Sequence, residues 1–276
     1  MDLSLIGLGT RLTAIASLNG LVMLSGVAVI PNINNSLDNA NKLPLEVAQS
    51  RSRNNISVAE IAREVTVRIL ENDGGGSGVI IDRKAQTYTV LTCAHVVERG
   101  DRYTILTSDG RSYSGRVQRS ARFGDNDLAI VQFTSDRSYQ VAAMGNSNSL
   151  AIGDEVYASG FPNWRFLNRD AIENTRDWGL RAFRLTKGYV EMVAERSLPR
   201  GYQLGYTNEI EDGMSGGPVL NNKGELVGIN GRLKFPPQGI QAYRFADGTA
   251  PSQALFKQME ALSWAIPIAT FQQRFR

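Results

Sequence analysis

Three groups that together could hydrolyse a peptide bond stand far apart in this chain of 276 residues. The only histidine, His95, follows an apolar run at positions 90–94, which places the imidazole at the end of a predicted strand. Asp127 directly precedes a second apolar run, and Ser215 lies in a glycine-rich turn. Serine chemistry needs a hydroxyl, an imidazole that takes its proton and a carboxylate that orients the imidazole. The chain supplies a candidate for each group.

The turn around Ser215 also suits the stabilisation of a developing negative charge. Its glycines permit a tight backbone that points the N–H groups of Gly213 and Ser215 at one spot, as an oxyanion hole requires. The turn also fits the G-x-S-x-G pattern of α/β-hydrolases, but those enzymes place a histidine after the serine and none follows Ser215. The order histidine, aspartate, serine is that of the chymotrypsin class.

Two neighbouring residues are alternatives for these roles. Asp125 is the fallback orienter of the imidazole, although Asp127 directly adjoins the apolar run. Cys93, the only cysteine, could act as a thiol nucleophile, but within an apolar run we expect a small buried side chain. One cysteine forms no internal disulfide, which is typical of a bacterial rather than a secreted animal protease.

The charge pattern excludes some partners. The net charge is +3, with many charges of both signs and no block of Lys or Arg, so we expect no nucleic-acid partner. The serine mechanism itself requires no cofactor and no metal ion.

The elements that position these groups are mostly short strands. β-branched and aromatic runs separated by Gly, Asn and Asp predict an all-β barrel or sandwich. Residues 108–111 and 222–225 are predicted hairpin turns whose glycine accepts a positive φ. Ser57 and Glu60 predict a capping box of a short N-terminal helix, and helical pattern returns at 252–262 and after Pro267. An insertion at 161–184 carries aromatic residues that we expect to pack locally.

Four motifs resemble the trypsin-like peptidase family, and the bacterial branch with the HtrA/Deg proteases is the most similar. They are residues 76–82, 91–97, 127–131 and 213–219. Residues 222–230 and 263–267 are similar to later strands of that family, so the resemblance covers roughly 67 to 268. It implies two six-stranded antiparallel β-barrels with the active site between them. It also implies that His95 is the general base, that Asp127 orients it and that Ser215 forms an acyl-enzyme.

The resemblance suggests substrate-binding residues as well. Glu209 stands six residues before Ser215, where trypsin-like enzymes carry the residue at the base of the primary specificity pocket, and Asp212 adds negative charge nearby. A buried carboxylate would favour Lys or Arg in the substrate, whereas a solvated Glu209 would not, and both interpretations stay open. Ile229, Asn230 and Gly231 are candidates for binding the substrate backbone. The long loop from 234 to about 250 is a candidate for substrate selection.

The N-terminal segment predicts export. Arg11 precedes an apolar stretch that reaches Ile30, and residues 26–28 supply the small side chains of a cleavage site after Ala28. Residues 1–30 are thus a signal peptide or, uncleaved, a membrane anchor. Residues 31–56 form a polar linker, and 57–276 the expected peptidase domain. The predicted location is periplasmic or extracellular, and because few residues follow the catalytic unit we expect no PDZ domain.

Two functions from different classes fit the sequence. One is a serine endopeptidase that acts on polypeptides. The other is a non-catalytic protease homologue that binds peptides in the same cleft. The complete set of three side chains favours the enzyme, because non-catalytic homologues usually lose one member. The oligomeric state is not predicted.

Overall fold

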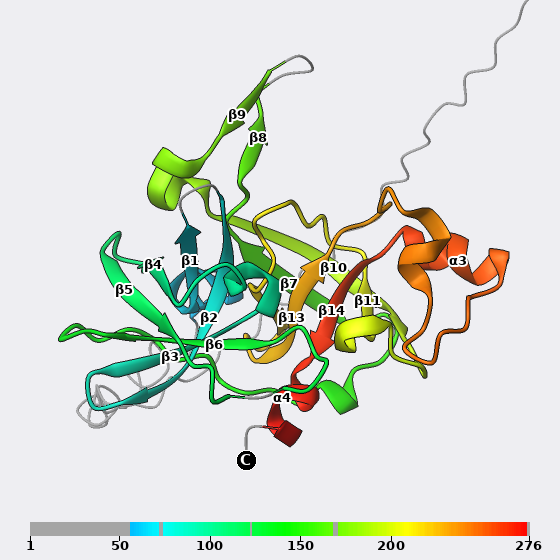
Figure 1. Cartoon of the computed structure of the whole chain (residues 1–276), viewed down its shortest axis with the longest axis horizontal. Coiled ribbons are helices and arrows are strands. Elements are labelled where there is room, and N and C mark those ends of the chain that lie inside the picture. Colours follow the sequence, from blue (N-terminus) through cyan, green and yellow to red (C-terminus); the bar gives the residue numbers. More distant parts are fainter. Residues whose placement is uncertain (1–55, 72–73, 122, 168–170, 275–276) are drawn as a thin grey trace, which may run out of the picture. The chain divides into compact units, whose positions relative to one another are not determined.

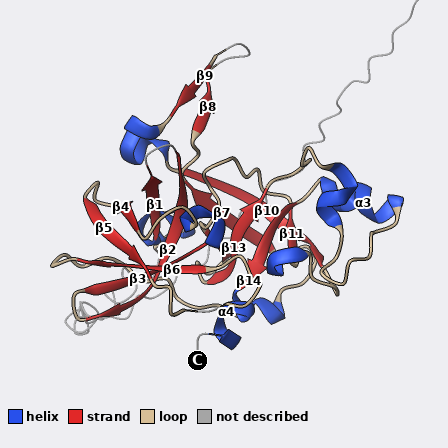
Figure 2. Ribbon diagram, viewed as in Figure 1, coloured by secondary structure: helices blue, strands red, loops and turns tan. Residues whose placement is uncertain are grey.

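Two closed barrels of antiparallel strands make up most of the protein in this computed structural model (Figures 1 and 2). The structure describes residues 56–276 apart from 72–73, 122, 168–170 and 275–276. The predicted signal peptide or anchor and nearly all of the predicted linker lie outside the described residues. Among the described helices, none is both long and apolar enough to cross a membrane.

The first barrel has the strand order β1-β2-β3-β6-β5-β4. Its strands are β1 (Thr66–Glu71), β2 (Gly74–Lys84), β3 (Thr87–Thr92), β4 (Arg102–Leu106), β5 (Ser112–Val117) and β6 (Ala129–Thr134). The second barrel has the order β10-β11-β14-β13-β12-β7. Its strands are β7 (Glu155–Gly160), β10 (Arg184–Val193), β11 (Leu204–Tyr206), β12 (Pro218–Asn221), β13 (Leu226–Arg232) and β14 (Ser263–Pro267). The predicted pair of six-stranded barrels is confirmed.

Strand alternation explains why the two barrels fill their interiors and also pack on each other. Successive side chains of a strand point to opposite faces. In β2, Ile80 belongs to the core of the first barrel, whereas Val79 and Ile81 join the apolar cluster that residues of both barrels share. In β3, Val90 likewise belongs to the core of the first barrel and Leu91 to the shared cluster. These strands are therefore apolar on both faces, and the shared cluster includes Cys93, two residues before His95.

Local signals in the sequence account for the ends of several elements. Helix α2 (Val58–Val65) begins with the predicted capping box, in which Ser57 accepts from the Glu60 N–H and donates its own N–H to the Glu60 carboxylate. The β4–β5 and β12–β13 hairpins turn at Gly110 and Gly224, which have φ values of +81° and +77°. The predicted C-terminal helices are α3 (Gln253–Glu260) and α4 (Ile268–Arg274).

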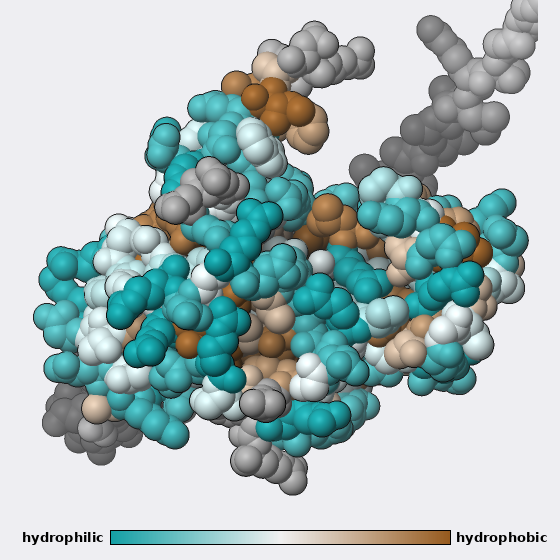
Figure 3. Space-filling view, in the orientation of Figure 1, coloured by the Kyte–Doolittle hydropathy of each residue, from teal (hydrophilic) through white to brown (hydrophobic). Residues whose placement is uncertain are grey.

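The insertion between β7 and β10 differs from the expectation. It contains a two-stranded ribbon of β8 (Trp164–Phe166) and β9 (Ile172–Asn174), which projects from the rest of the protein in Figure 1. Phe161 is buried and packs on Phe183, as expected. Trp164 and Phe166 are instead 48% and 73% exposed, and the ribbon shows apolar surface in Figure 3. The expectation that these aromatics pack locally was wrong for the ribbon, because its strands pair only with each other.

Candidate active site

The three candidate residues come from both barrels. His95 lies in the 3-10 helix η1 (Ala94–Val97) directly after β3, and Asp127 lies two residues before β6. Because β3 and β6 are neighbours, with Thr92 opposite Ala129, the two residues emerge side by side from the same end of the first barrel. Ser215 lies in the turn before β12 of the second barrel.

The structure brings His95 and Asp127 into direct contact. The His95 Nδ1 lies 2.6 Å from Oδ2 of Asp127, and the His95 backbone N–H donates to Oδ1 at 3.0 Å. The Asp127 side chain is only 2% exposed, whereas the imidazole is about one-third exposed. A carboxylate facing Nδ1 holds the proton on that nitrogen, so Nε2 is the nitrogen that can accept a proton.

Two further side chains contact Asp127, and sequence reasoning missed both. An Arg200 Nη2 donates to Oδ1 at 2.7 Å, and the Tyr202 hydroxyl donates to Oδ2 at 2.6 Å. Burial by itself raises the pKa of Asp127, but the hydrogen bonds and charge of His95 and the hydroxyl of Tyr202 outweigh it and lower this pKa to about 2. The carboxylate is therefore ionised at any pH at which the protein would work.

The turn that carries Ser215 depends on two glycines with positive φ. Gly213 and Gly216 have φ values of +91° and +86°, which residues with a side chain rarely adopt. A Cβ at Gly216 would lie 2.2 Å from the carbonyl oxygen of Ser77, and one at Gly213 would lie 2.6 Å from that of Phe161. The turn is also tied to both barrels, because the Ser77 N–H donates to Ser215 O and the Gly216 N–H donates to Asn230 O, each at 2.8 Å.

The Ser215 hydroxyl is not hydrogen-bonded to His95. It donates to the carbonyl of Gly231 at a long distance of 3.5 Å. The two residues nevertheless share a neighbourhood, since a Cβ on Gly76 would contact both Val96, next to His95, and the Ser215 backbone. Bonds between a nucleophile and its base are often loose without substrate and tighten when substrate binds.

The backbone around Ser215 has free donors. Across the described residues, neither the Gly213 N–H nor the Ser215 N–H donates to a protein acceptor, while the neighbouring Met214 N–H donates to the carbonyl of Glu211. Two unsatisfied N–H groups within one turn are what a developing oxyanion needs.

Cys93 lies close to the imidazole but is inert. Its thiol, the His95 ring and the Asp127 carboxylate have ligand atoms within 4.8 Å of one another. Burial and the charge of Asp127 raise the pKa of the Cys93 thiol far above its usual range, so no thiolate forms. Sγ donates to the carbonyl of Asn230 at 3.3 Å. The cysteine is a buried packing residue of the shared apolar cluster.

The candidate specificity residues occupy different settings. The Glu209 side chain is 69% exposed, and its carboxylate accepts from Lys234 Nζ at 2.5 Å. Asp212 is exposed and accepts from the side-chain amide of Asn163 at 3.1 Å. Among the strand candidates, Ile229 and Asn230 are buried, and the Gly231 carbonyl faces the Ser215 hydroxyl.

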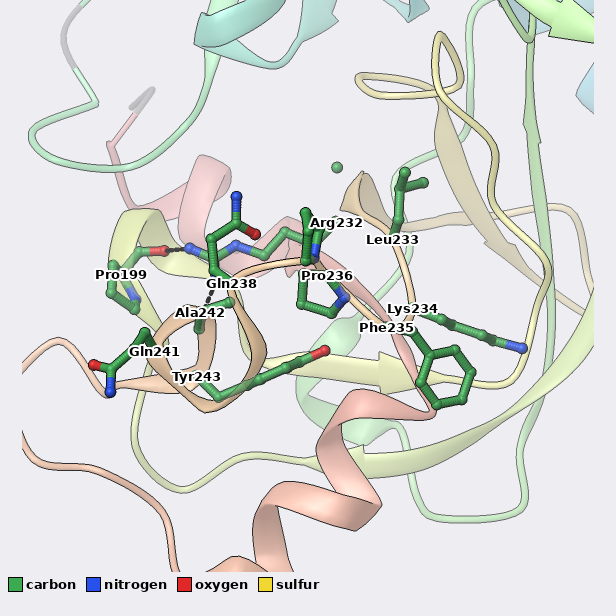
Figure 4. A pocket seen from close by; sticks show the side chains of 12 residues that line it. Pro199, Arg232, Leu233, Lys234, Phe235, Pro236, Gln238, Gln241, Ala242 and Tyr243 are labelled. Carbon is green, nitrogen blue, oxygen red and sulfur yellow. Dashed lines mark hydrogen bonds between the residues drawn. The ribbon is translucent and has the colours of Figure 1, made fainter.

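A cavity of about 600 Å³ adjoins Gly231 at the end of β13 (Figure 4). Its walls come from the end of β13, from the loop at 235–238, from the 3-10 helix η5 (Gly239–Tyr243) and from Pro199. Arg232 braces it by donating to the carbonyls of Pro199 and Ala242, each at 2.9 Å. The long loop after β13 thus forms one wall of a space next to Ser215.

The lowered pKa of Asp127 predicts a specific sensitivity to acid. An aspartate in an unfolded chain titrates near about 3.9, whereas Asp127 in the folded protein has a pKa of about 2. Its ionised form therefore stabilises the fold above about pH 4, and this contribution is lost as the pH falls towards 2. It amounts to on the order of 2 kcal/mol, of which about half is lost by pH 3.

Urea denaturation between about pH 6 and pH 3 checks this expectation. The free energy of unfolding of the unaltered protein should fall by about 1 kcal/mol more than that of Asp127→Asn. Asp125→Asn, which changes an exposed neighbour, should keep the full acid sensitivity. An equal fall for all three proteins would contradict the stabilisation of the Asp127 carboxylate.

Comparison with known proteins identifies the family of the chain. A family model described as a trypsin-like peptidase domain matches residues 76–229, which is more than half of the chain. The HhoA protein of Synechocystis sp. is 33% identical over 170 residues, which cover 60% of this chain and 39% of that protein. The serine protease Do-like HtrA of Bacillus subtilis is 30% identical over 181 residues, covering 63% of this chain and 36% of that protein.

A third relative is a Buchnera aphidicola protein whose name describes a probable periplasmic serine endoprotease, DegP-like. It is 28% identical over 174 residues, which cover 62% of this chain and 32% of that protein. The chain thus spans about a third of the length of the curated relatives it matches. The match to the family model and the two six-stranded barrels lead to the same conclusion: the chain belongs to the trypsin-like peptidase domain family.

Proposed function

We propose that the protein is a serine endopeptidase that hydrolyses polypeptides through an acyl-enzyme on Ser215. The observation that carries this proposal is the buried Asp127 carboxylate at 2.6 Å from Nδ1 of His95, which leaves Nε2 as a proton acceptor near the Ser215 turn. Membership of the trypsin-like peptidase family and the names of the HtrA relatives support it.

The proposed reaction has two halves. The Ser215 oxygen attacks the scissile carbonyl carbon while His95 Nε2 takes the hydroxyl proton, and the Gly213 and Ser215 N–H groups bind the oxyanion. His95 then gives that proton to the leaving amine as the C–N bond breaks. In the second half His95 takes a proton from a water molecule whose oxygen attacks the ester, and His95 then gives that proton to the Ser215 oxygen as the ester C–O bond breaks. Asp127 stays ionised and keeps His95 in the required tautomer.

The proposed enzyme does not rely on Glu209 to select Lys or Arg. A carboxylate discriminates basic side chains when it is buried and unpaired. Glu209 is mostly exposed and already binds Lys234, so this observation favours the alternative of a solvated loop residue. The cavity beside Gly231 is the proposed binding site for substrate residues on the acyl side, and the loop at 234–250 is proposed to take part in substrate selection.

The proposed location is outside the cytoplasm, periplasmic or extracellular. The N-terminal pattern of residues 1–30 supports export, with or without membrane attachment, and the Buchnera relative is named as periplasmic. On this proposal, residues 57–276 are the peptidase domain that acts after export.

Reaction with a fluorophosphonate probe tests the proposed function directly. The Ser215 oxygen should displace fluoride from the phosphorus atom, and the hydroxyl proton should pass to His95. The adduct should map to the peptide that contains Ser215 in a mass spectrum, and the unlabelled protein should hydrolyse fluorescein-labelled casein. Peptide binding without labelling and without hydrolysis would favour the non-catalytic homologue instead.

A further inference from the structure

Arg200 contacts Asp127 through both its side chain and its backbone. Its guanidinium donates to Oδ1 of the carboxylate at 2.7 Å, and its carbonyl accepts the Asp127 N–H at 2.9 Å. Arg200 belongs to the 3-10 helix η4 (Pro199–Gly201) in the β10–β11 loop of the second barrel, while Asp127 belongs to the first. The contact therefore joins the two barrels at the residue that orients the imidazole.

The backbone of this loop fits the contact closely. Arg200 has a φ of +70°, which residues with a side chain rarely adopt, and Gly201 follows with a φ of +88°. A Cβ on Gly201 would lie 2.3 Å from the side-chain oxygen of Asn126. Non-glycine residues hold a positive φ only where the surrounding structure imposes it, and they are concentrated at functional sites.

Tyr202 makes the second contact from the same loop. Its ring is buried, and its hydroxyl donates to Oδ2 of Asp127 at 2.6 Å, the oxygen that also faces Nδ1 of His95. Burial and the nearby negative charge raise the pKa of Tyr202 well above its usual value, so the hydroxyl keeps its proton and remains a donor. The guanidinium of Arg232 stacks over the same ring, with its central carbon 4.6 Å from the ring centroid.

We propose that Arg200 and Tyr202 are positioning residues that fix the Asp127 carboxylate from the second barrel and offset its charge at His95. This proposal rests on the proposed function, because positioning of Asp127 matters for catalysis only if His95 acts as the base. A buried carboxylate alone would strongly favour the protonated imidazole. The Arg200 cation binds the same carboxylate and opposes that effect, so removing it should strengthen the attraction of Asp127 for a proton on the imidazole.

The other charged or titratable groups around this carboxylate do not replace Arg200. The Cys93 thiol is neutral and donates to the carbonyl of Asn230. The Arg232 cation points to the carbonyls of Pro199 and Ala242 rather than to Asp127. Among the described residues, Arg200 is thus the only permanent cation that donates a hydrogen bond to Asp127.

The single histidine makes a direct measurement feasible. In protein labelled with carbon-13 in the imidazole ring, and carrying no polyhistidine tag, one ring signal reports His95. Its titration can be followed by NMR whether or not the protein hydrolyses any substrate. Arg200→Gln should move the midpoint of this titration upward by about half to one pH unit, as estimated for a partly exposed unit charge several ångströms away.

Three further variants separate positioning from a general effect of the substitution. Tyr202→Phe removes one donor to the carboxylate and should move the midpoint upward by about half a pH unit. Arg200→Lys keeps the charge and should stay within about 0.3 pH unit of the unaltered protein. Arg196→Gln is the matched control, because Arg196 lies in the same loop, binds the exposed Asp247 and is 51% exposed, compared with 46% for Arg200. It should leave the midpoint unchanged.

The rate of fluorophosphonate labelling is measured on the same proteins across pH. Arg200→Gln should label about tenfold more slowly on the alkaline plateau, with its acid limb displaced upward, and Arg200→Lys should recover most of the rate. Thermal melting checks that each variant is folded. If Arg200→Gln does not fold, the comparison of Tyr202→Phe with Arg200→Lys tests the positioning role instead.

The outcomes for the two proposals are distinct. Midpoints for Arg200→Gln and Tyr202→Phe that match Arg196→Gln would overturn the positioning role, even if Ser215 is labelled normally. Displaced midpoints in a protein that the probe never labels would support the positioning role and overturn the proposed hydrolysis.

Discussion

Replacing Ser215 by alanine is expected to lower the hydrolysis of fluorescein-labelled casein by about five to six orders of magnitude. Alanine has no hydroxyl, so no acyl-enzyme can form and His95 has no proton to accept. The binding surfaces and the free N–H groups of Gly213 and Ser215 stay in place, and these account for the small rate that should remain above the uncatalysed reaction. Labelling by the fluorophosphonate probe should disappear completely.

The matched control is Ser149→Ala, which removes the hydroxyl of an exposed serine that follows β6 in the chain. It should retain hydrolysis within about twofold, as expected for the substitution of an exposed surface residue. If Ser215→Ala kept more than about one part in a hundred of the hydrolysis, a different residue would be the nucleophile.

Replacing Asp127 by asparagine should lower hydrolysis by about four orders of magnitude at neutral pH. An asparagine can turn its amide N–H₂ towards Nδ1 of His95, which selects the tautomer that carries the proton on Nε2 and so removes the base. The substitution also deprives Arg200 of its ionic partner. The initial rate of casein hydrolysis, measured between about pH 6 and pH 9, checks the effect.

Asp125→Asn tests the alternative orienter with the same chemical change. Asp125 is exposed, and the carboxylate that contacts His95 is that of Asp127. We therefore expect this variant to hydrolyse casein within about twofold of the unaltered protein. The reverse result, with a large loss for Asp125→Asn and a small one for Asp127→Asn, would reassign the orienting carboxylate to Asp125.

Much of the fold followed from local signals and from the resemblance of four motifs. The turns at Gly110 and Gly224 were predictable because a hairpin needs a residue that tolerates positive φ, and both glycines have it. The capping box at Ser57 was predictable because its two partners are three residues apart. Such features depend only on residues that are close together in the chain, so they can be recognised in the sequence itself.

Contacts between distant residues escaped prediction. Nothing in the sequence around Arg200 indicates that its side chain reaches a carboxylate 73 positions earlier. Glu209 was a reasonable candidate for a charged pocket until its partner Lys234, 25 positions later, was found at its side. The exposure of Trp164 and Phe166 also depends on how the β8–β9 ribbon projects, which aromatic composition alone does not specify.

The order of the strands has a consequence for a chain still under synthesis. β14 closes the second barrel between β11 and β13, and it is the last of that barrel's six strands along the chain. The turn that carries Ser215 is hydrogen-bonded to the Asn230 carbonyl of β13 and to the Ser77 N–H of β2. Its conformation therefore depends on both barrels being folded. On the proposed assignment, a ribosome-bound chain that already contains His95 and Asp127 has no working nucleophile until residue 267 has emerged. The growing chain is therefore not expected to cut itself or its neighbours before the second barrel has closed.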